Sequence, residues 1–276
     1  MPRGGNRAYV VITSAGERQM RFGVIGGTGV YRLTTGEKGG DQMEVETAYG
    51  GVLVDRIRLA DAEVAFIARH GGEHNIPPHR VNYRGNIAAL KKLGVTNILA
   101  SAAVGSLVES MPPGALSVLT QFIDWTRGRP STFFDGEGGE VVHVDMTEPY
   151  CPHLREELST AAEALGEKVH LEATYVCAEG PRFETPAEIR MFRQMGGDLV
   201  GMTSVPEVVL AREAGICYAA VAIVTNWAAG VSGEPVEHGR VSEFMGRQTP
   251  RVRALFEEAI SAHKETDCSC RTWASE

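Results

Sequence analysis

Apolar runs alternate with segments of helical periodicity from Arg21 to about Lys264. Runs that are apolar throughout are typical of strands covered on both faces, and apolar residues three or four apart indicate helices. The pattern predicts strands over residues 22–25, 52–59, 64–68, 97–100, 117–119, 173–177, 199–202 and 217–224. It predicts helices over residues 81–93, 152–165, 186–195 and 206–214, followed by a pair near 236–247 and 250–263. This alternation favours an α/β layer architecture.

Prolines and glycines support these helix boundaries. Proline fits the first turn of a helix, and glycine fits the residue that ends it. The prolines are Pro152, Pro186, Pro206 and Pro250, and the glycines are Gly94, Gly166, Gly196 and Gly215.

The periodic region contains no low-complexity linker, so we expect one domain over residues 21–264. Residues 1–20 hold Gly and Arg around one short apolar run, and we expect a disordered extension or the product of an upstream start site. Residues 265–276 form a polar tail with a Cys-x-Cys motif. Residues 121–149 are rich in Gly, Pro, Asp and aromatic residues without a clear period, which predicts long surface loops of the kind that often carry function.

Charge and hydropathy limit the partners. The 276 residues include 27 Lys plus Arg and 35 Asp plus Glu, a net charge of −8, which opposes binding to a nucleic-acid backbone. No apolar run reaches the roughly 20 residues that span a bilayer, and no secretory segment precedes a cleavage site. We therefore expect a cytoplasmic protein with neither a nucleic-acid nor a membrane partner, which binds any phosphate in a local pocket.

The cysteines do not form an obvious framework, because their number is five. Cys151, Cys177 and Cys217 lie in apolar contexts that are typical of small buried hydrophobic residues. Cys268 and Cys270 lie on the polar tail, where two sulfurs alone cannot complete a tetrahedral zinc site and no histidine cluster is near. A reduced tail and a redox clip that closes the terminus both remain open.

A glycine-rich turn, Gly26-Gly27-Thr28-Gly29, follows the first strand. It does not fit the dinucleotide fingerprint, because the position of the third glycine is Arg32. Successive backbone N–H groups and the Thr28 hydroxyl could still hold a small anion. Phosphate binding is the preferred interpretation over a structural turn or NAD binding.

Arg69 and His70 follow a strand, at the edge where α/β proteins tend to bind ligands. The planar guanidinium of Arg suits phosphate. His70, His74 and His79 also raise the question of a metal, but the glycines and prolines between them oppose a ligand-bearing helix, and no acidic cluster completes a site. We expect no catalytic metal.

Small residues end another strand at Ser101-Ala102-Ala103-Val104-Gly105-Ser106. They are typical of backbone that approaches a ligand. The chain has no Gly-x-Ser-x-Gly elbow, so we do not expect a serine hydrolase.

Several short motifs also occur in a characteristic order, at residues 25–29, 68–71, 81–83, 105–107, 121–124, 148–152, 179–183 and 202–208. Through them, residues 21–263 resemble the phosphorylase family that contains methylthioadenosine phosphorylase and the trimeric purine nucleoside phosphorylases. The resemblance implies a single-domain, mixed-sheet α/β nucleoside phosphorylase fold with flanking helices. It also implies a homotrimer that cleaves an N-glycosidic bond with inorganic phosphate as cosubstrate, without a cofactor or metal.

The resemblance assigns roles by position. The phosphate-binding residues would be Thr28, Arg69, His70, Ala102, Ala103 and Thr203. Met202 would lie against the ribose, and Phe183 and Ala228 would contact the nucleoside. His143 of a neighbouring subunit would close over the 5′ end of the ribose, and His238 would face a 5′-hydroxyl where the methylthio branch carries an apolar residue.

Three positions depart from the methylthioadenosine branch. Glu184 replaces a small hydroxyl residue, and Asn226 and Ala228 replace two aspartates. These changes resemble the 6-oxopurine branch.

The chemistry of Glu184 and Asn226 gives the same preference. A 6-oxopurine has an N1–H donor and O6 and N7 acceptors, whereas a 6-aminopurine has an N1 acceptor. An ionised Glu184 only accepts hydrogen bonds, while Asn226 can donate to N7 or O6. Considered alone, Glu184 could be a helix N-terminal acid and Asn226 a turn residue.

We therefore expect Asn226 and Glu184 to be the catalytic residues of a purine nucleoside phosphorylase that converts inosine and guanosine to free base and ribose 1-phosphate. Asn226 would stabilise charge on the departing purine, and Glu184 would hold N1. The alternatives are an S-methyl-5′-thioinosine or methylthioadenosine phosphorylase and a nucleoside-binding protein without activity.

Overall fold

The computed structural model describes residues 10–11, 20–27, 41–137, 139, 141–233 and 235–272, without the side chains of residues 10, 11, 238, 240 and 242. Apart from residues 10–11 and 20, the predicted N-terminal extension lies outside this part. The turn residue Thr28 lies outside it too.

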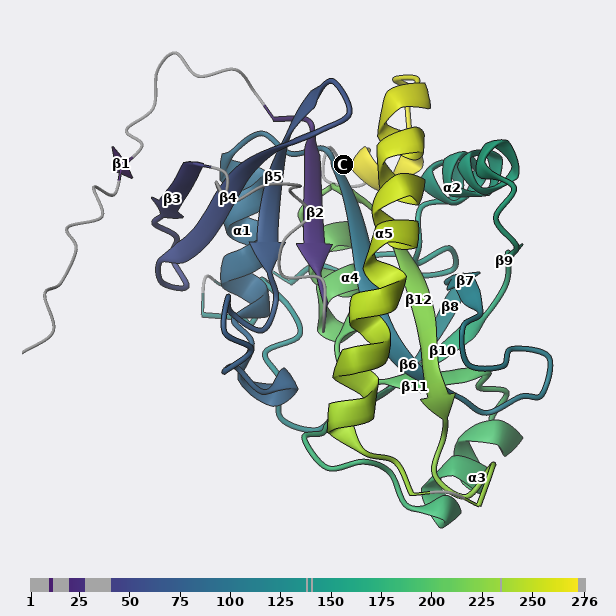
Figure 1. Cartoon of the computed structure of the whole chain (residues 1–276). Helices are drawn as coiled ribbons and strands as arrows, with labels where there is room; N and C mark the ends of the chain where they lie inside the picture. The colour runs from purple at the N-terminus through teal and green to yellow at the C-terminus, as the bar shows by residue number, and fades with distance from the viewer. Residues whose placement is uncertain are drawn as a thin grey trace, which may run out of the picture.

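The strands form one mixed sheet (Figure 1). They are β1 (Val10–Val11), β2 (Phe22–Gly26), β3 (Asp41–Val45), β4 (Val52–Leu59), β5 (Ala62–Ala68), β6 (Asn97–Ser106), β7 (Leu116–Val118), β8 (Gln121–Trp125), β9 (Val169–His170), β10 (Thr174–Ala178), β11 (Leu199–Gly201) and β12 (Cys217–Trp227). Their order is β1-β3-β4-β5-β2-β6-β11-β10-β8, with β12 on the second edge of β6, followed by β7 and β9.

Helices cover both faces of the sheet (Figure 1). They are α1 (Tyr83–Lys92), α2 (Pro152–Leu165), α3 (Pro186–Gln194), α4 (Ser204–Glu213) and α5 (His238–Ala262), with short 3-10 turns at Pro78–Arg80 and Ser269–Arg271. Along β12, Ala220 and Ala222 belong to the core under α1 and α4, whereas Val221 and Ile223 belong to the core under α2 and α5. The alternation of side chains in a strand thus explains why this apolar run is buried on both sides.

The predicted α/β class and each predicted strand are confirmed, but the described strands β1, β3, β8 and β9 were not anticipated. β8 lies inside the segment that was expected to be loops, and it pairs in parallel with β10. β3 is half-buried and pairs with β4 at the far side of the sheet. Neither strand is apolar enough to stand out in the sequence.

The expected pair of C-terminal helices was wrong, because α5 is one helix of 25 residues with Pro250 inside it. Proline in a helix interior costs about 3 kcal/mol. The buried residues Met245, Val252 and Leu255 continue across the proline and pack in one core. Burial of this stripe offsets the missing backbone hydrogen bond.

The central strand β6 changes neighbours along one of its edges. Residues 97–100 pair with β2 in parallel, and residues 105–106 pair with β11 in the antiparallel sense. The carboxyl ends of β2 and β11 therefore both point toward residues 101–104. A place where neighbouring strands diverge at their carboxyl ends is where α/β proteins bind ligands.

A buried ion pair lies beside this divergence. Arg69, which follows β5, donates through Nε and Nη2 to the Glu207 carboxylate of α4 at 2.8 and 2.6 Å. Tyr218 of β12 donates to the same carboxylate at 2.7 Å. Burial alone would lower the pKa of the Arg69 guanidinium, but the charge of Glu207 raises it, so Arg69 stays charged. The pair joins three elements around the centre of the sheet.

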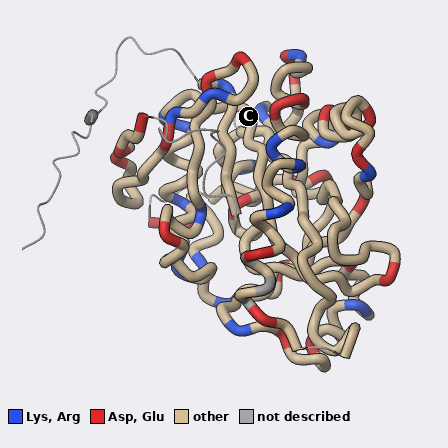
Figure 2. Tube along the Cα trace, in the orientation of Figure 1, with Lys and Arg blue, Asp and Glu red and all other residues tan. Residues whose placement is uncertain are grey.

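Charged residues of both signs alternate along the chain over the face shown in Figure 2. The net charge of the whole chain is −8. Of the helices in the described part of the chain, none combines the length and apolar character needed to cross a membrane.

The buried pair predicts a large stability effect. Replacement Glu207→Gln leaves the Arg69 charge buried without its carboxylate, so the free energy of unfolding should fall by about 3–5 kcal/mol. Urea denaturation measures this change. The control is Glu243→Gln, in an exposed ion pair with Arg247, which should change stability by less than about 0.5 kcal/mol. Equal effects of the two substitutions would contradict the role of the buried pair.

Candidate active site

A cavity of about 370 Å³ opens where β2 and β11 diverge from β6. Its walls come from the carboxyl-terminal parts of β2, β6, β11 and β12 and from the loops at residues 70–78 and 181–184. Val236 before α5 and Val241 in the first turn of α5 complete the lining. Segments far apart in the sequence thus share one cavity.

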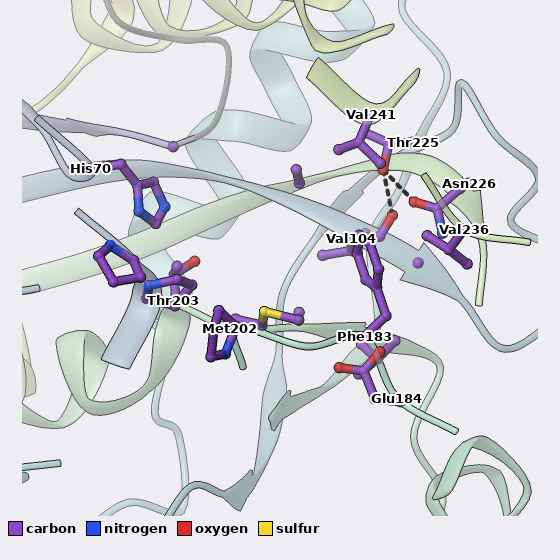
Figure 3. Close-up of a pocket in the computed structure, with 18 of the residues that line it drawn as sticks. His70, Val104, Phe183, Glu184, Met202, Thr203, Thr225, Asn226, Val236 and Val241 are labelled. Atoms are coloured by element: carbon purple, nitrogen blue, oxygen red, sulfur yellow. Dashed lines mark hydrogen bonds between the residues drawn. The ribbon is translucent and has the colours of Figure 1, made fainter. Parts of the chain in front are cut away.

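The polar side chains of the cavity gather at two ends (Figure 3). His70 and Thr203 lie at one end, and Glu184 and Asn226 lie at the other. Met202 lies between them. The arrangement can hold an anion and a heterocyclic base at opposite ends of one elongated ligand.

At the anion end, Gly27, His70, Ala103 and Thr203 all line the cavity. Thr203 precedes α4, and its hydroxyl does not cap that helix. The Gly27 N–H is already used, because it donates to Ser101 Oγ at 3.0 Å. The rest of the expected turn, from Thr28 on, lies outside the described residues.

The proton on His70 is fixed by its neighbour. Its Nδ1 lies 2.8 Å from the carbonyl oxygen of Ile76, which can only accept, so Nδ1 must be the donor. In the neutral ring, Nε2 is then an acceptor that suits the hydroxyl of a hydrogen phosphate, and in the charged ring it is a donor to a phosphate oxygen.

Two residues expected to bind phosphate do not line the cavity. Ala102 is 2% exposed and faces the core, because strand side chains alternate and its neighbour Ala103 faces the cavity. Arg69 lies beneath Gly27, where a Cβ added to the glycine would be 2.9 Å from Arg69 Nη1. Nη1 also donates to the Ser101 carbonyl oxygen at 2.8 Å. Arg69 therefore brings its charge to the floor of the anion end, while its fork binds Glu207.

At the other end, Glu184 does not cap a helix. The residue that caps α3 is Thr185, whose hydroxyl accepts from the Glu188 N–H at 3.2 Å while the Glu188 carboxylate accepts from the Thr185 N–H at 2.8 Å. Arg182 also pairs with Glu188. Glu184 Oε1 is buried and has no hydrogen-bond partner among the described residues. Burial raises the pKa of Glu184. A buried acceptor without a partner is suited to a ligand donor.

Asn226 is placed by a bulge in β12. The register with β6 shifts between Val224 and Asn226, which leaves Thr225 as the extra residue. The Asn226 Nδ2 donates to the Trp227 carbonyl oxygen at 2.8 Å, and its Oδ1 accepts from the Thr225 hydroxyl at 2.7 Å. These two bonds fix the orientation of the amide and leave its second N–H for a ligand.

Of the other residues expected to contact the nucleoside, two line the cavity and two do not have a described side chain in it. Phe183, 36% exposed, and Ala228, 3% exposed, both line the cavity near Glu184 and Asn226. His143 is exposed and does not line the cavity of its own chain. His238 begins α5, but its side chain lies outside the described residues.

Sequence reasoning missed Arg129, which is buried and holds the cavity wall together. Its Nη1 donates to the carbonyl oxygens of Met202 and Val205, both at 2.8 Å. Its Nη2 donates to the carbonyl oxygen of Glu179 at 2.7 Å. The guanidinium thus fixes the segment that bears Met202 to the segment that leads to Glu184. Arginine in an expected surface loop carries no sequence signal for this role. The apolar wall at Val236 and Val241 was missed as well.

Comparison with known proteins finds similar chains over most of this sequence. The 6-oxopurine nucleoside phosphorylase of Pyrococcus furiosus is 50% identical over 257 residues, which cover 91% of this chain and 96% of that protein. A probable S-methyl-5′-thioinosine phosphorylase of Methanopyrus kandleri is 48% identical, with 90% and 95% covered. The structure of methylthioadenosine phosphorylase from Schistosoma mansoni in complex with adenine superposes with a TM-score of 0.82 at 37% identity, with 89% and 93% covered. The family model described as the phosphorylase superfamily matches residues 21–261. With its cavity between diverging strands and a match over almost the whole sheet, this chain belongs to the phosphorylase superfamily.

Proposed function

We propose that this chain is a purine nucleoside phosphorylase that cleaves 6-oxopurine nucleosides, inosine and guanosine, with inorganic phosphate. The observation that carries the proposal is the buried, unpartnered Oε1 of Glu184 in the same cavity as the Asn226 amide. An ionised carboxylate accepts from the N1–H of a 6-oxopurine, but it would face the lone pair of a 6-aminopurine N1.

The anion end holds the cosubstrate. Phosphate would be bound by His70 and Thr203, with Ala103 allowing close approach and Thr28 completing the turn. Arg69 contributes positive charge from beneath Gly27. The bound phosphate lies next to the ribose over Met202, which places one of its oxygens for attack on the anomeric carbon.

The base end stabilises the leaving group. As the bond between the anomeric carbon and N9 stretches, its electron pair moves onto the purine, and a phosphate oxygen bonds to the anomeric carbon. The free N–H of Asn226 donates to N7 or O6 of the purine, where this charge gathers. Glu184 holds N1–H, and Phe183 packs against the ring. Ala228 adds no charge beside the base.

Two 5′ substituents fit the residues at this end of the ribose. His238 would hydrogen-bond a 5′-hydroxyl, while the apolar wall at Val236 and Val241 also suits a methylthio group. For this reason S-methyl-5′-thioinosine is the second candidate substrate. We further propose a homotrimer in which His143 of one subunit closes over the ribose in the next.

The function is tested by release of free base from inosine, adenosine, methylthioadenosine and methylthioinosine, each with and without phosphate. We expect phosphate-dependent release from the two 6-oxopurine nucleosides, at least about 100-fold faster than from their 6-amino counterparts, because a mismatched N1 leaves Glu184 unpaired. Binding of inosine without release in phosphate would show a nucleoside-binding protein and would sink the proposal.

The amide of Asn226 predicts a change of base preference. Replacement Asn226→Asp places a carboxylate oxygen against the Trp227 carbonyl and removes the donor to N7 or O6. The kcat/KM for inosine should fall by about tenfold to a hundredfold, and the preference for inosine over adenosine should narrow. The matched variant Asn226→Ala should also lose inosine cleavage, but its preference for inosine over adenosine should not narrow in the same way. Wild-type kinetics in Asn226→Asp would contradict the assigned role.

Burial of Glu184 predicts an acid limb in the pH profile. Because the pKa of Glu184 is raised, this carboxylate takes up its proton at a higher pH than an ordinary carboxylate does. The kcat/KM for inosine should therefore fall as the pH decreases. The protonated acid can donate to N1 of adenosine, so the preference for inosine over adenosine should weaken.

Replacement Glu184→Gln should remove this limb and reduce discrimination by at least about tenfold. The control Glu188→Ala removes the side chain that accepts from the Thr185 N–H, and it should lower stability while discrimination is retained. An unchanged acid limb in Glu184→Gln would assign the titration to another group.

A further inference from the structure

Four of the five cysteines meet at one point, far from the cavity. Cys151 precedes α2, Cys217 begins β12, and Cys268 and Cys270 lie on the tail after α5. Their four sulfur atoms all lie within 4.8 Å of one another. None of them lines the cavity. Cys217 is nine residues before Asn226 on the same strand, a separation of about 30 Å.

We propose that Cys151, Cys217, Cys268 and Cys270 form a structural zinc site that fastens the C-terminal tail to the sheet. Zinc in structural sites binds four thiolates in a tetrahedron with Zn–S distances of about 2.3 Å, which places sulfurs about 3.8 Å apart. The Cys151 and Cys268 sulfurs are 3.6 Å apart. Two separate disulfides need only two close pairs, whereas one ion requires all four sulfurs to be mutual neighbours.

The backbone around the cluster is already fixed. The Cys151 N–H donates to the Tyr218 carbonyl oxygen at 2.8 Å, and the Cys217 N–H donates to the Thr96 carbonyl oxygen at 3.0 Å. On the tail, Arg271 donates to the Asn97 side chain at 2.9 Å. Each ligand therefore approaches from a segment that is held in place by contacts other than the sulfurs.

The surroundings also suit the charge of the site. Binding converts four thiols and Zn²⁺ into a tetrathiolate complex of charge −2 with release of four protons, and no oxidation occurs. Arg212, which is 8% exposed, interacts electrostatically with Cys270. Its positive charge offsets part of the negative charge of the complex. Cys151, Cys217 and Cys270 are each at most 2% exposed, so water has little access.

No zinc site was predicted from the sequence, because only the two cysteines of the tail are close together in the sequence. Two tail sulfurs alone cannot complete a tetrahedron, but the fold brings the sulfurs of Cys151 and Cys217 to them. A second cluster, His153, Glu157 and His263, is explained without a metal, because Glu157 pairs with both histidines at 3.2 and 2.9 Å.

The test uses the full chain without a polyhistidine tag, reduced and freed of metal under anaerobic conditions, and then titrated with Zn²⁺ or Co²⁺. We expect one equivalent of metal per chain, absorption typical of tetrahedral cobalt thiolate, and a higher Tm with zinc. Cys268 is the most exposed of the four cysteines. Loss of a residue that only orients a metal ligand can weaken metal binding by about 100-fold, so Cys268→Ser, which removes a ligand itself, should weaken zinc binding by at least this factor.

Two controls separate the site from other thiols and from the histidine cluster. Cys177→Ala removes the fifth cysteine, and His263→Gln removes the second cluster; both should retain one equivalent of metal and the cobalt thiolate absorption. The proposal is overturned if the reduced wild-type chain shows no cobalt thiolate absorption, or if Cys268→Ser binds zinc as tightly as the wild type. If the four cysteines serve only to form two disulfides, the reduced chain takes up no metal and shows no cobalt thiolate absorption.

Discussion

The ion pair between Arg69 and Glu207 is the interaction on which the rest of the site depends. Glu207 holds Nε and Nη2 of the guanidinium, and this leaves Nη1 under Gly27 and against the Ser101 carbonyl. The pair is thus oriented, with its positive end toward the anion end of the cavity. A buried charge is tolerated only with such a partner, so the same contact that secures α4 to the sheet also sets the field in the cavity.

The cavity itself follows from strand pairing. Along one edge, β6 pairs first with β2 and then with β11. Along its other edge, the bulge in β12 shifts the register between Val104 and Gly105 of β6. Arg129 then ties the backbone after β11 to the backbone after β10. The two polar ends are therefore held by sheet geometry and one buried guanidinium, which gives the fixed spacing that electrostatic catalysis requires.

Much of this could be predicted from local patterns. Short stretches of sequence were enough to predict the apolar strands and the helix start at Pro186. They were also enough to single out Glu184 and Asn226 as departures from the methylthioadenosine branch. What could not be predicted depends on partners distant in the chain. Arg129 and Glu207 have ordinary neighbours in the sequence, and only the fold shows that they are buried. Pro250 predicted a helix start, but packing on both sides of it decided otherwise. The meeting of Cys151 and Cys217 with the tail cysteines is likewise a property of topology.

The cap of α3 has a consequence for the adjacent residue 184. Thr185 and Glu188 stabilise the helix start, while the adjacent Glu184 takes no part in it. Under the proposed function, a substitution at residue 184 therefore changes the contact to the nucleobase while the hydrogen bonds that begin α3 stay in place.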